Sequence, residues 1–236
     1  MNPDSREQVL KKPIRTIIFD MDNTLFDLVE AQIASCGEVT RFLGRDEGET
    51  LFKYFLRPVR GFEAHENILD YMNDRQIRDN GQYPASCRLY ETAKLRHITA
   101  YEGVITTLQS LRDRGYRMGI VTDAHSRDAT RRLEKAGLFS YFDSMVTYDM
   151  VMVKKPAREP FLFLLEMLKS DFCETLIVGD SPRRDLEPCK QLGITTVYAR
   201  YGDRFSRTRN YAGADYAIDS MGELQVILDR LGMPDS

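Results

Sequence analysis

The sequence lacks the features of an exported protein, a membrane protein and a cysteine-ligated zinc protein. It has only four cysteines, and no two of them form a CxxC pair, which argues against a zinc site of that kind. No stretch approaches the roughly 18 consecutive apolar residues of a membrane span. Residues 1–12 are polar and charged, without the apolar centre of a signal peptide. We therefore expect a cytoplasmic protein with reduced thiols.

An excess of basic residues is also missing. Lysine and arginine number 33 against 36 aspartates and glutamates, so the net charge is −3, and the isoelectric point is about 5.7. This balance argues against nucleic acid or an anionic membrane as a partner. We see no repeat, low-complexity tract or coiled-coil stripe, so the choice between a monomer and a homodimer stays open. The composition is that of a globular protein with one large domain or two modest ones.

From about residue 101 the hydrophobic pattern alternates between strands and helices. Strands are expected at residues 117–121, 144–148, 175–178, 194–199 and 216–218, and helices at 103–114, 127–136, 159–169, 182–192 and 221–231. This alternation predicts an α/β fold, a Rossmann-like, doubly wound parallel sheet with right-handed crossovers.

Residues 26–98 break this pattern, because no strong strand appears there. Helices are expected at 31–43, 49–55, 64–73 and 87–96. The sequence therefore predicts three parts: a flexible tail at 1–13, a core domain at 14–25 and 99–236, and an inserted helical domain at 26–98.

The most informative segment is residues 14–25. Its apolar, β-branched start reads as a buried strand, which ends at two aspartates one residue apart, Asp20 and Asp22. Side chains alternate along a strand, so both carboxylates should leave its carboxyl end on the same side. Ligands of open α/β sheets bind at that end. Two converging carboxylates favour a divalent cation between them.

Three later strand ends carry chemistry that complements these acids. Thr122 and Asp123 follow the strand at 117–121, Lys155 lies just before Pro156, and Gly179-Asp180 ends the strand at 175–178. A further acid, Asp185, comes five residues after Asp180. Each segment alone is typical of a turn or loop, but all four lie at strand-to-helix junctions in a defined order.

In these four segments the sequence resembles the haloacid dehalogenase superfamily of hydrolases. The first and fourth, Asp20-Met21-Asp22-Asn23-Thr24 and Gly179-Asp180 with Asp185, are the most specific. The resemblance covers residues 14–25 and 101–220, and the insertion after the first strand is similar in position to a C1-type helical cap. It implies a cap that acts as a lid during the reaction.

The resemblance also implies roles for the acids. Asp20 would be the nucleophile that forms an aspartyl phosphate, and Asp22 the general acid and base. Mg²⁺ would be bound by the carboxylates of Asp20 and Asp180 and by the backbone carbonyl of Asp22. Asp185 would lie behind these ligands, near Lys155 or a metal-bound water.

The remaining implied roles concern the phosphoryl group. Thr122 and the backbone N–H of Asp123 would hold its oxygens, and Lys155 would offset its negative charge. Lys154 competes for that role, but the family pattern has lysine directly before proline. Arg158 departs from the pattern, since many relatives have proline there.

Several activities share this pattern. The acids Asp22 and Asp180 argue against haloacid dehalogenation, which needs no metal. A phosphonatase would need a cap lysine, for which nothing in the sequence marks Lys53 or Lys94. A sugar-phosphate mutase and a non-catalytic binding protein on the same fold remain alternatives to a phosphatase.

The substrate is expected to be a small phosphorylated metabolite selected by the inserted domain. Residues 53–62 mix aromatic and cationic side chains and are followed by His65. We hypothesise that Arg57, Arg60 or His65 contacts the leaving group. The sequence does not identify the metabolite.

Overall fold

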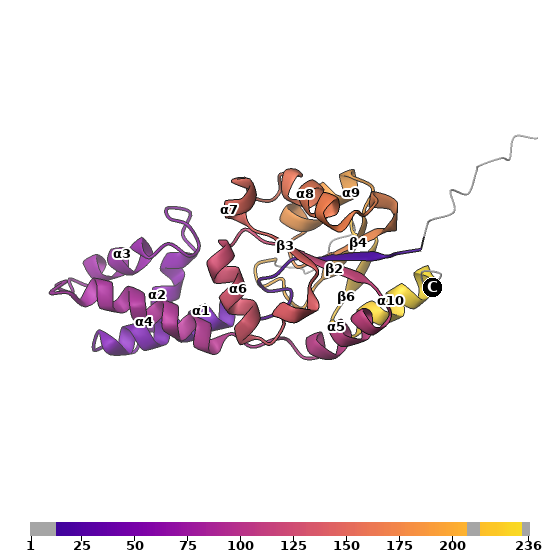
Figure 1. Cartoon of the computed structure of the whole chain (residues 1–236). Helices are drawn as coiled ribbons and strands as arrows, with labels where there is room; N and C mark the ends of the chain where they lie inside the picture. Colours follow the sequence, from indigo (N-terminus) through magenta and orange to yellow (C-terminus); the bar gives the residue numbers. More distant parts are fainter. Residues whose placement is uncertain (1–12, 207–212, 233–236) are drawn as a thin grey trace, which may run out of the picture. The chain divides into compact units, whose positions relative to one another are not determined.

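The computed structural model describes residues 13–206 and 213–232, so the predicted flexible tail at 1–13 lies, apart from Pro13, outside the described residues. The chain divides into two compact units (Figure 1). Unit 1 contains the residues up to Leu25, Tyr101–Ala129 and the residues from Leu138 onward. Unit 2 contains Phe26–Ala100 and Thr130–Gly137.

Unit 1 is built on a parallel sheet, which among the described residues has the strand order β3-β2-β1-β4-β5-β6. The strands are β1 (Thr16–Phe19), β2 (Arg117–Val121), β3 (Ser144–Val146), β4 (Thr175–Gly179), β5 (Thr195–Ala199) and β6 (Tyr216–Ile218). The predicted α/β, doubly wound fold is therefore confirmed. The strand order reverses direction between β1 and β4, and in such sheets the carboxyl ends at this switch point form the binding crevice.

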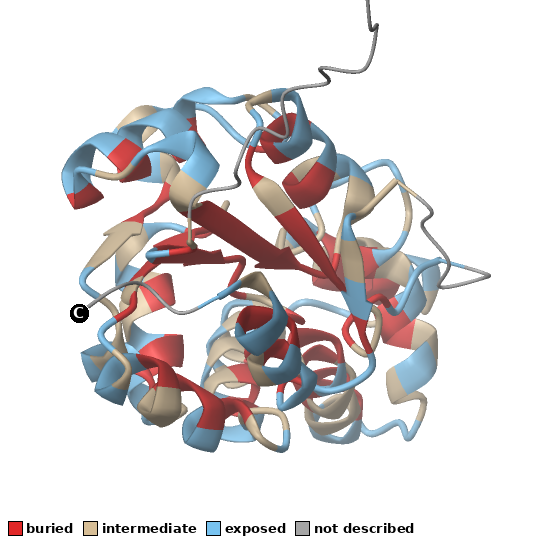
Figure 2. Cartoon of the chain, turned by 90° about the vertical axis from the view of Figure 1, so that its right-hand side faces the viewer, coloured by how far each residue is buried: buried red, intermediate tan, exposed pale blue. Residues whose placement is uncertain are grey.

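Helices cover both faces of this sheet. In Figure 1, α8 (Glu159–Leu168) and α9 (Glu187–Gln191) lie on one face, while α5 (Val104–Asp113) and α10 (Glu223–Leu231) lie on the other. Shorter elements are α7 (Tyr148–Val151), the 3₁₀ turns Phe139–Tyr141 and Phe172–Glu174, and a π-helical turn at Pro182–Leu186. The central strands β1 and β4 are wholly buried between these layers (Figure 2), as expected for a parallel sheet, whereas the edge strands β3 and β6 are only partly buried.

Unit 2 is helical. It contains α1 (Leu28–Phe42), α2 (Gly48–Phe55), α3 (Glu66–Asp74) and α4 (Gln82–His97), together with most of α6 (Ser126–Lys135). Its core is rich in aromatic side chains, and the rings of Phe55 and Tyr90 stack with their centroids 4.9 Å apart. Unit 2 thus has a hydrophobic core of its own.

Several predicted elements differ from the structure in their bounds, and three of these differences have a local explanation. The strand predicted at 144–148 ends at Val146, because α7 begins at Tyr148. The helix predicted at 87–96 begins at Gln82, since Pro84 is tolerated in a first turn. The helix predicted at 182–192 is split into a π-helical turn and α9, and Pro188 has no N–H with which to continue an α-helix across this point.

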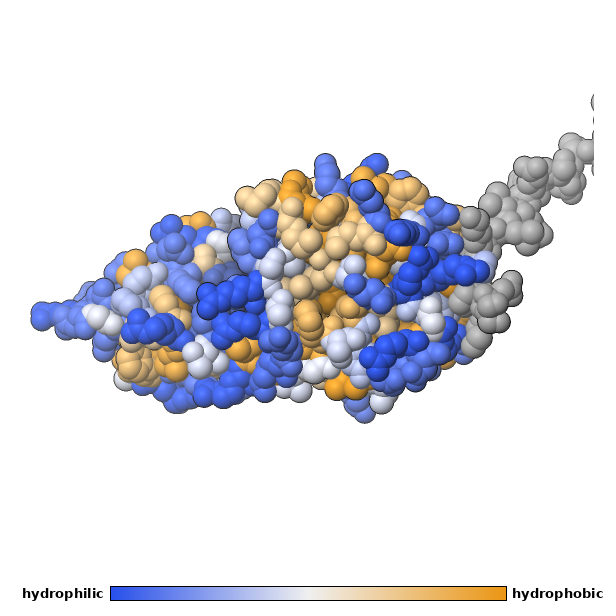
Figure 3. Space-filling view, in the orientation of Figure 1, coloured by the Kyte–Doolittle hydropathy of each residue, from blue (hydrophilic) through white to orange (hydrophobic). Residues whose placement is uncertain are grey.

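Hydrophobic side chains also reach the surface of unit 1. Leu162, Phe163 and Met167 on α8 are about 40% exposed, and Figure 3 shows hydrophobic side chains gathered on this part of the molecule. No helix among the described residues is long and apolar enough to cross a membrane.

The contact between α1 and α2 gives a stability prediction. A Cβ atom added at Gly48 would lie 2.6 Å from the Cα of Gly37, whereas one added at Gly37 would meet only the flexible end of Arg41, at 3.3 Å. We expect Gly48→Ala to lower the free energy of unfolding by about 1–3 kcal/mol through overpacking. Gly37→Ala, the matched control in a helix interior, should be neutral or stabilising by about 0.5–1 kcal/mol. Urea unfolding measures both, and equal effects would contradict the close approach of these helices.

Candidate active site

The two strands at the switch point each end in an aspartate. Phe19 on β1 pairs with Val178 on β4, and the next residue of β1 continues this ladder, because the N–H of Asp20 donates to the Val178 carbonyl at 2.9 Å. Asp180 directly follows Gly179, the last residue of β4. The parallel register therefore brings the first and fourth sequence motifs to one place.

A third acid completes a buried cluster. Carboxylate oxygens of Asp20, Asp180 and Asp185 lie within 4.8 Å of one another, and none of these residues is more than 4% exposed. Asp185 comes from the π-helical turn, and it packs so closely on Gly179 that an added Cβ there would lie 2.6 Å from its own Cβ. Glycine at 179 is thus required for the three carboxylates to converge.

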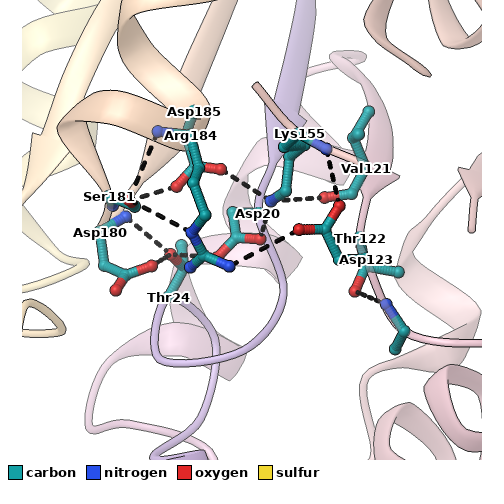
Figure 4. A network of polar contacts seen from close by, with 11 residues as sticks. Asp20, Thr24, Val121, Thr122, Asp123, Lys155, Asp180, Ser181, Arg184 and Asp185 are labelled. Atoms are coloured by element: carbon teal, nitrogen blue, oxygen red, sulfur yellow. Dashed lines mark hydrogen bonds and ion pairs between the residues drawn. The ribbon is translucent and has the colours of Figure 1, made fainter. Parts of the chain in front are cut away.

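Lys155 supplies the buried positive charge. Its Nζ donates to Asp20, to Asp185 at 2.7 Å and to the Val121 carbonyl at 3.2 Å, and its side chain is 1% exposed (Figure 4). Three buried carboxylates therefore face one buried ammonium group and the partly exposed guanidinium of Arg184, so negative charge is in excess here if all three acids are ionised.

This imbalance separates the pKa values of the acids. Burial alone would raise the pKa of Asp20, but the charges of Lys155 and Arg184 outweigh burial and hold that pKa below its usual value. For Asp180, burial and the neighbouring charges of Asp20 and Asp185 together raise the pKa well above its usual value. The electrostatics therefore favour ionisation of Asp20 over ionisation of Asp180.

Thr24 links the two acids, a role that sequence reasoning missed although this residue belongs to the first motif. Its Oγ1 accepts from the N–H of Asp180 at 3.1 Å, and the same oxygen lies 3.2 Å from Asp20 Oδ2 and 3.4 Å from Asp180 Oδ1. The loop that carries Thr24 is held by Tyr201, whose hydroxyl donates to the Thr24 carbonyl at 2.7 Å. Asp22 lies half-buried in this loop, two residues after Asp20.

The second and third motifs meet beside Asp20. Thr122 is 4% exposed, and its N–H continues the ladder to Val146 of β3 at 3.0 Å. Asp123 accepts the N–H of Lys155 at 2.9 Å through Oδ1, which fixes the loop that carries the lysine. The residues of the four predicted core motifs therefore lie at the carboxyl edge of this sheet, at strand ends or in the segments that directly follow them.

Arg184 is a second group that sequence reasoning missed. Its Nε donates to Ser181 Oγ at 3.3 Å, and its Nη1 lies 3.7 Å from Asp123 Oδ2 (Figure 4). Its place at the site could have been inferred from the sequence, because Arg184 directly precedes Asp185 in the fourth motif.

The predicted cap residues lie in unit 2, and each is paired with an acid there. Arg57 and Arg60 share Asp70, with nitrogen–oxygen distances of 3.2 and 3.4 Å, and His65 Nε2 lies 2.9 Å from Glu91 Oε1. These contacts give the three cationic side chains structural partners within their own unit.

Lys94 is buried, although nothing in the sequence marks it so. It is 4% exposed, and its Nζ donates to Glu63 at 2.8 Å and to Glu91 at 3.0 Å. Arg132 also pairs with Glu63. These contacts give Lys94 structural partners within unit 2.

A family model for haloacid dehalogenase-like hydrolases matches residues 17–199. The chain belongs to this family. It is 29% identical to a pyrophosphatase PpaX of Bacillus mycoides, over 92% of this chain and 98% of that protein. It is 27% identical to a glyceraldehyde 3-phosphate phosphatase of Methanocaldococcus jannaschii, over 92% and 98% of the two chains.

A solved structure adds to this likeness. The structure of a HAD phosphatase from Thermococcus onnurineus matches with a TM-score of 0.64 and 28% identity, and covers 91% of this chain and 98% of that chain. The family of hydrolases inferred from the four sequence motifs is therefore confirmed, and with it the reaction class of hydrolase.

The burial of Lys155 among carboxylates gives a prediction for the stability of this hydrolase. Removing the ammonium in Lys155→Met leaves buried carboxylates uncompensated, and we expect the free energy of unfolding to fall by about 3–5 kcal/mol in the presence of chelator. Lys154→Met is the matched control, since that side chain is exposed and contacts the Tyr148 ring at 5.1 Å, a contact of about 0.5–1 kcal/mol. Chemical denaturation measures both, and two similar small losses would show that the buried lysine is not the balancing charge.

Proposed function

We propose that the protein is a Mg²⁺-dependent phosphatase that hydrolyses a small phosphorylated metabolite through an aspartyl phosphate on Asp20. The observation that carries the proposal is the arrangement of Asp20, a buried carboxylate with a lowered pKa that contacts Lys155 and faces a second acid, Asp180. An ionised carboxylate at a switch point is suited to attack phosphorus. The names of the relatives, a pyrophosphatase and a glyceraldehyde 3-phosphate phosphatase, support the same reaction class.

In the proposed reaction an oxygen of Asp20 forms a bond to phosphorus while the bond to the leaving oxygen breaks. Asp22 gives a proton to that oxygen, then removes one from the water that hydrolyses the aspartyl phosphate and releases inorganic phosphate. Asp22 is suited to both steps, because it lies on the same loop as Asp20 and is half-buried rather than enclosed.

The residues present fit a divalent cation. Oxygen ligands from carboxylates and carbonyls are those that Mg²⁺ prefers, and the excess of negative charge in the buried cluster favours such a cation. Asp20, Asp180 and the backbone carbonyl of Asp22 would hold it. Bound there, it would offset the charge of the phosphoryl group and help to orient it.

The other residues position these groups. Asp185 has both oxygens engaged, by Lys155 at 2.7 Å and by the N–H of Ser181 at 3.0 Å, which suits a role behind the ligands rather than among them. We propose that Lys155 offsets the charge shared by Asp20 and the phosphoryl group. Thr122 and the N–H of Asp123 would bind the phosphoryl oxygens.

The reaction predicts phosphate release that depends on both the nucleophile and the cation. With a panel of small phosphorylated metabolites we expect release in Mg²⁺, none in chelator, and a loss of at least about 10³-fold in Asp20→Asn, since the isosteric amide is not a nucleophile. Asp180→Asn should raise the Mg²⁺ concentration needed for half-maximal rate. Colorimetric phosphate assays measure these rates.

Two results would contradict the proposal. Release that persists in Asp20→Asn would remove Asp20 as the nucleophile. Conversion of a sugar phosphate into its isomer without phosphate release would identify a mutase, whereas no reaction with any metabolite would favour a non-catalytic binding protein. Circular dichroism of Asp20→Asn controls for loss of the fold.

Contact of Arg57, Arg60 or His65 with the leaving group stays a prediction. If Arg60 makes it, Arg60→Ala should raise KM by about tenfold, the effect of losing one charge-assisted hydrogen bond, while kcat changes less. Arg75→Ala is the control, because Arg75 also pairs with an acid of unit 2, Glu47, at 2.7 Å. Unchanged KM and kcat across the metabolite panel would exclude Arg60 and leave its pairing with Asp70 as its role.

A further inference from the structure

The guanidinium group of Arg184 lies near the carboxylate cluster, where it interacts electrostatically with Asp185, Asp20 and Asp180. Figure 4 shows it in front of Asp20, between Asp180 on one side and Lys155 on the other. The two cations differ in exposure, since the side chain of Arg184 is 43% exposed and that of Lys155 only 1%. Arg184 is therefore the cation of this site that solvent and solutes can reach.

Acids surround the guanidinium group of Arg184 and interact with its charge, but they lie too far away to accept short hydrogen bonds from it. Partial desolvation lowers the pKa of Arg184, but four acids, Asp185, Asp20, Asp180 and Asp123, together raise it above the usual value. Yet the shortest ion pair of Arg184 within the described part of the chain is 3.7 Å, to Asp123 Oδ2. Charge-assisted hydrogen bonds are about 2.7–2.9 Å long.

Lys155 is in the opposite situation. Its three donors are matched by three acceptors, two of them carboxylates, so it is committed to the buried cluster. A guanidinium group presents five N–H donors in a planar fork that fits two oxygens of a phosphate or carboxylate. Arg184, with Nε on Ser181 Oγ, keeps its terminal nitrogens directed toward the region in front of Asp20 (Figure 4).

We propose that Arg184 binds a second anionic group of the substrate, next to the phosphoryl group that Asp20 receives. The inference rests on the proposed phosphatase function and narrows its substrate class. The preferred substrates are compact molecules with two anions a few bonds apart, such as a diphosphate or a phosphate ester with a neighbouring carboxylate. A substrate whose leaving group is neutral makes no such contact.

A matched pair of substrates tests this selection. Phosphoglycolate and 2-hydroxyethyl phosphate have the same short skeleton, but only phosphoglycolate carries a carboxylate beside the ester. We would measure kcat and KM for both with the wild-type protein, Arg184→Gln, Arg184→Lys and Arg183→Gln, in Mg²⁺. Arg183 is the matched control, because it is the adjacent arginine and is exposed.

The expected result is a change in preference. The wild-type protein and Arg183→Gln should favour phosphoglycolate in kcat/KM by about tenfold or more, the effect of one charge-assisted contact. Arg184→Gln should abolish that preference, mainly through KM, and Arg184→Lys should retain part of it because a point charge remains. The conservative lysine variant also separates loss of charge from loss of the fold.

Other results would overturn the inference. Equal losses with both esters in Arg184→Gln would show that Arg184 acts on the buried acids or the transferred phosphoryl group instead. Absence of any preference in the wild-type protein would exclude a second-anion site. If the wild-type protein released phosphate from both esters with equal kcat/KM and in an Asp20-dependent way, this inference alone would fall; if it released none from any phosphorylated metabolite, the proposed function would fall with it.

Discussion

Crowding of negative charge at one edge of the sheet is the constraint on which the site depends. The register of β1 and β4 places Asp20 beside Asp180, and the turn after β4 adds Asp185. Taking carboxylates out of water is costly unless opposite charge and hydrogen bonds accompany them. Lys155 provides one such charge, and the remainder is what makes a divalent cation at this place physically reasonable. In our account, stability and catalysis thus depend on the same charges.

The general fold was predictable because its signals are local. Short apolar strands alternate with amphipathic helices from residue 101 on, and turn-forming residues mark most of the boundaries. The departures occur where a local rule was overridden. Thr147 is the N-cap of α7 directly after β3, and Asp149 in the first turn accepts from the N–H of Ser126 at 2.8 Å. Pro188 interrupts what reads as one helix. Such contacts between segments cannot be seen in hydrophobic periodicity.

The core of the site was predictable for a different reason, since each motif lies at a strand end and parallel strands bring those ends together. Sequence reasoning did not find Thr24, Arg184 or the burial of Lys94. These depend on side-chain direction and on pairs far apart in the chain, such as Thr24 with Asp180. The partners of Arg57 and Arg60 were also hidden, because Asp70 lies on a separate helix.

The central claim is that Asp20 forms a covalent bond to phosphorus. The most direct test is rapid acid quenching of the protein during turnover of a ³²P-labelled substrate, followed by peptide mapping. Our account predicts a hydroxylamine-sensitive label on the peptide that contains Asp20, absent in Asp20→Asn. Phosphate release with no labelled peptide, or with the label on another residue, would contradict it.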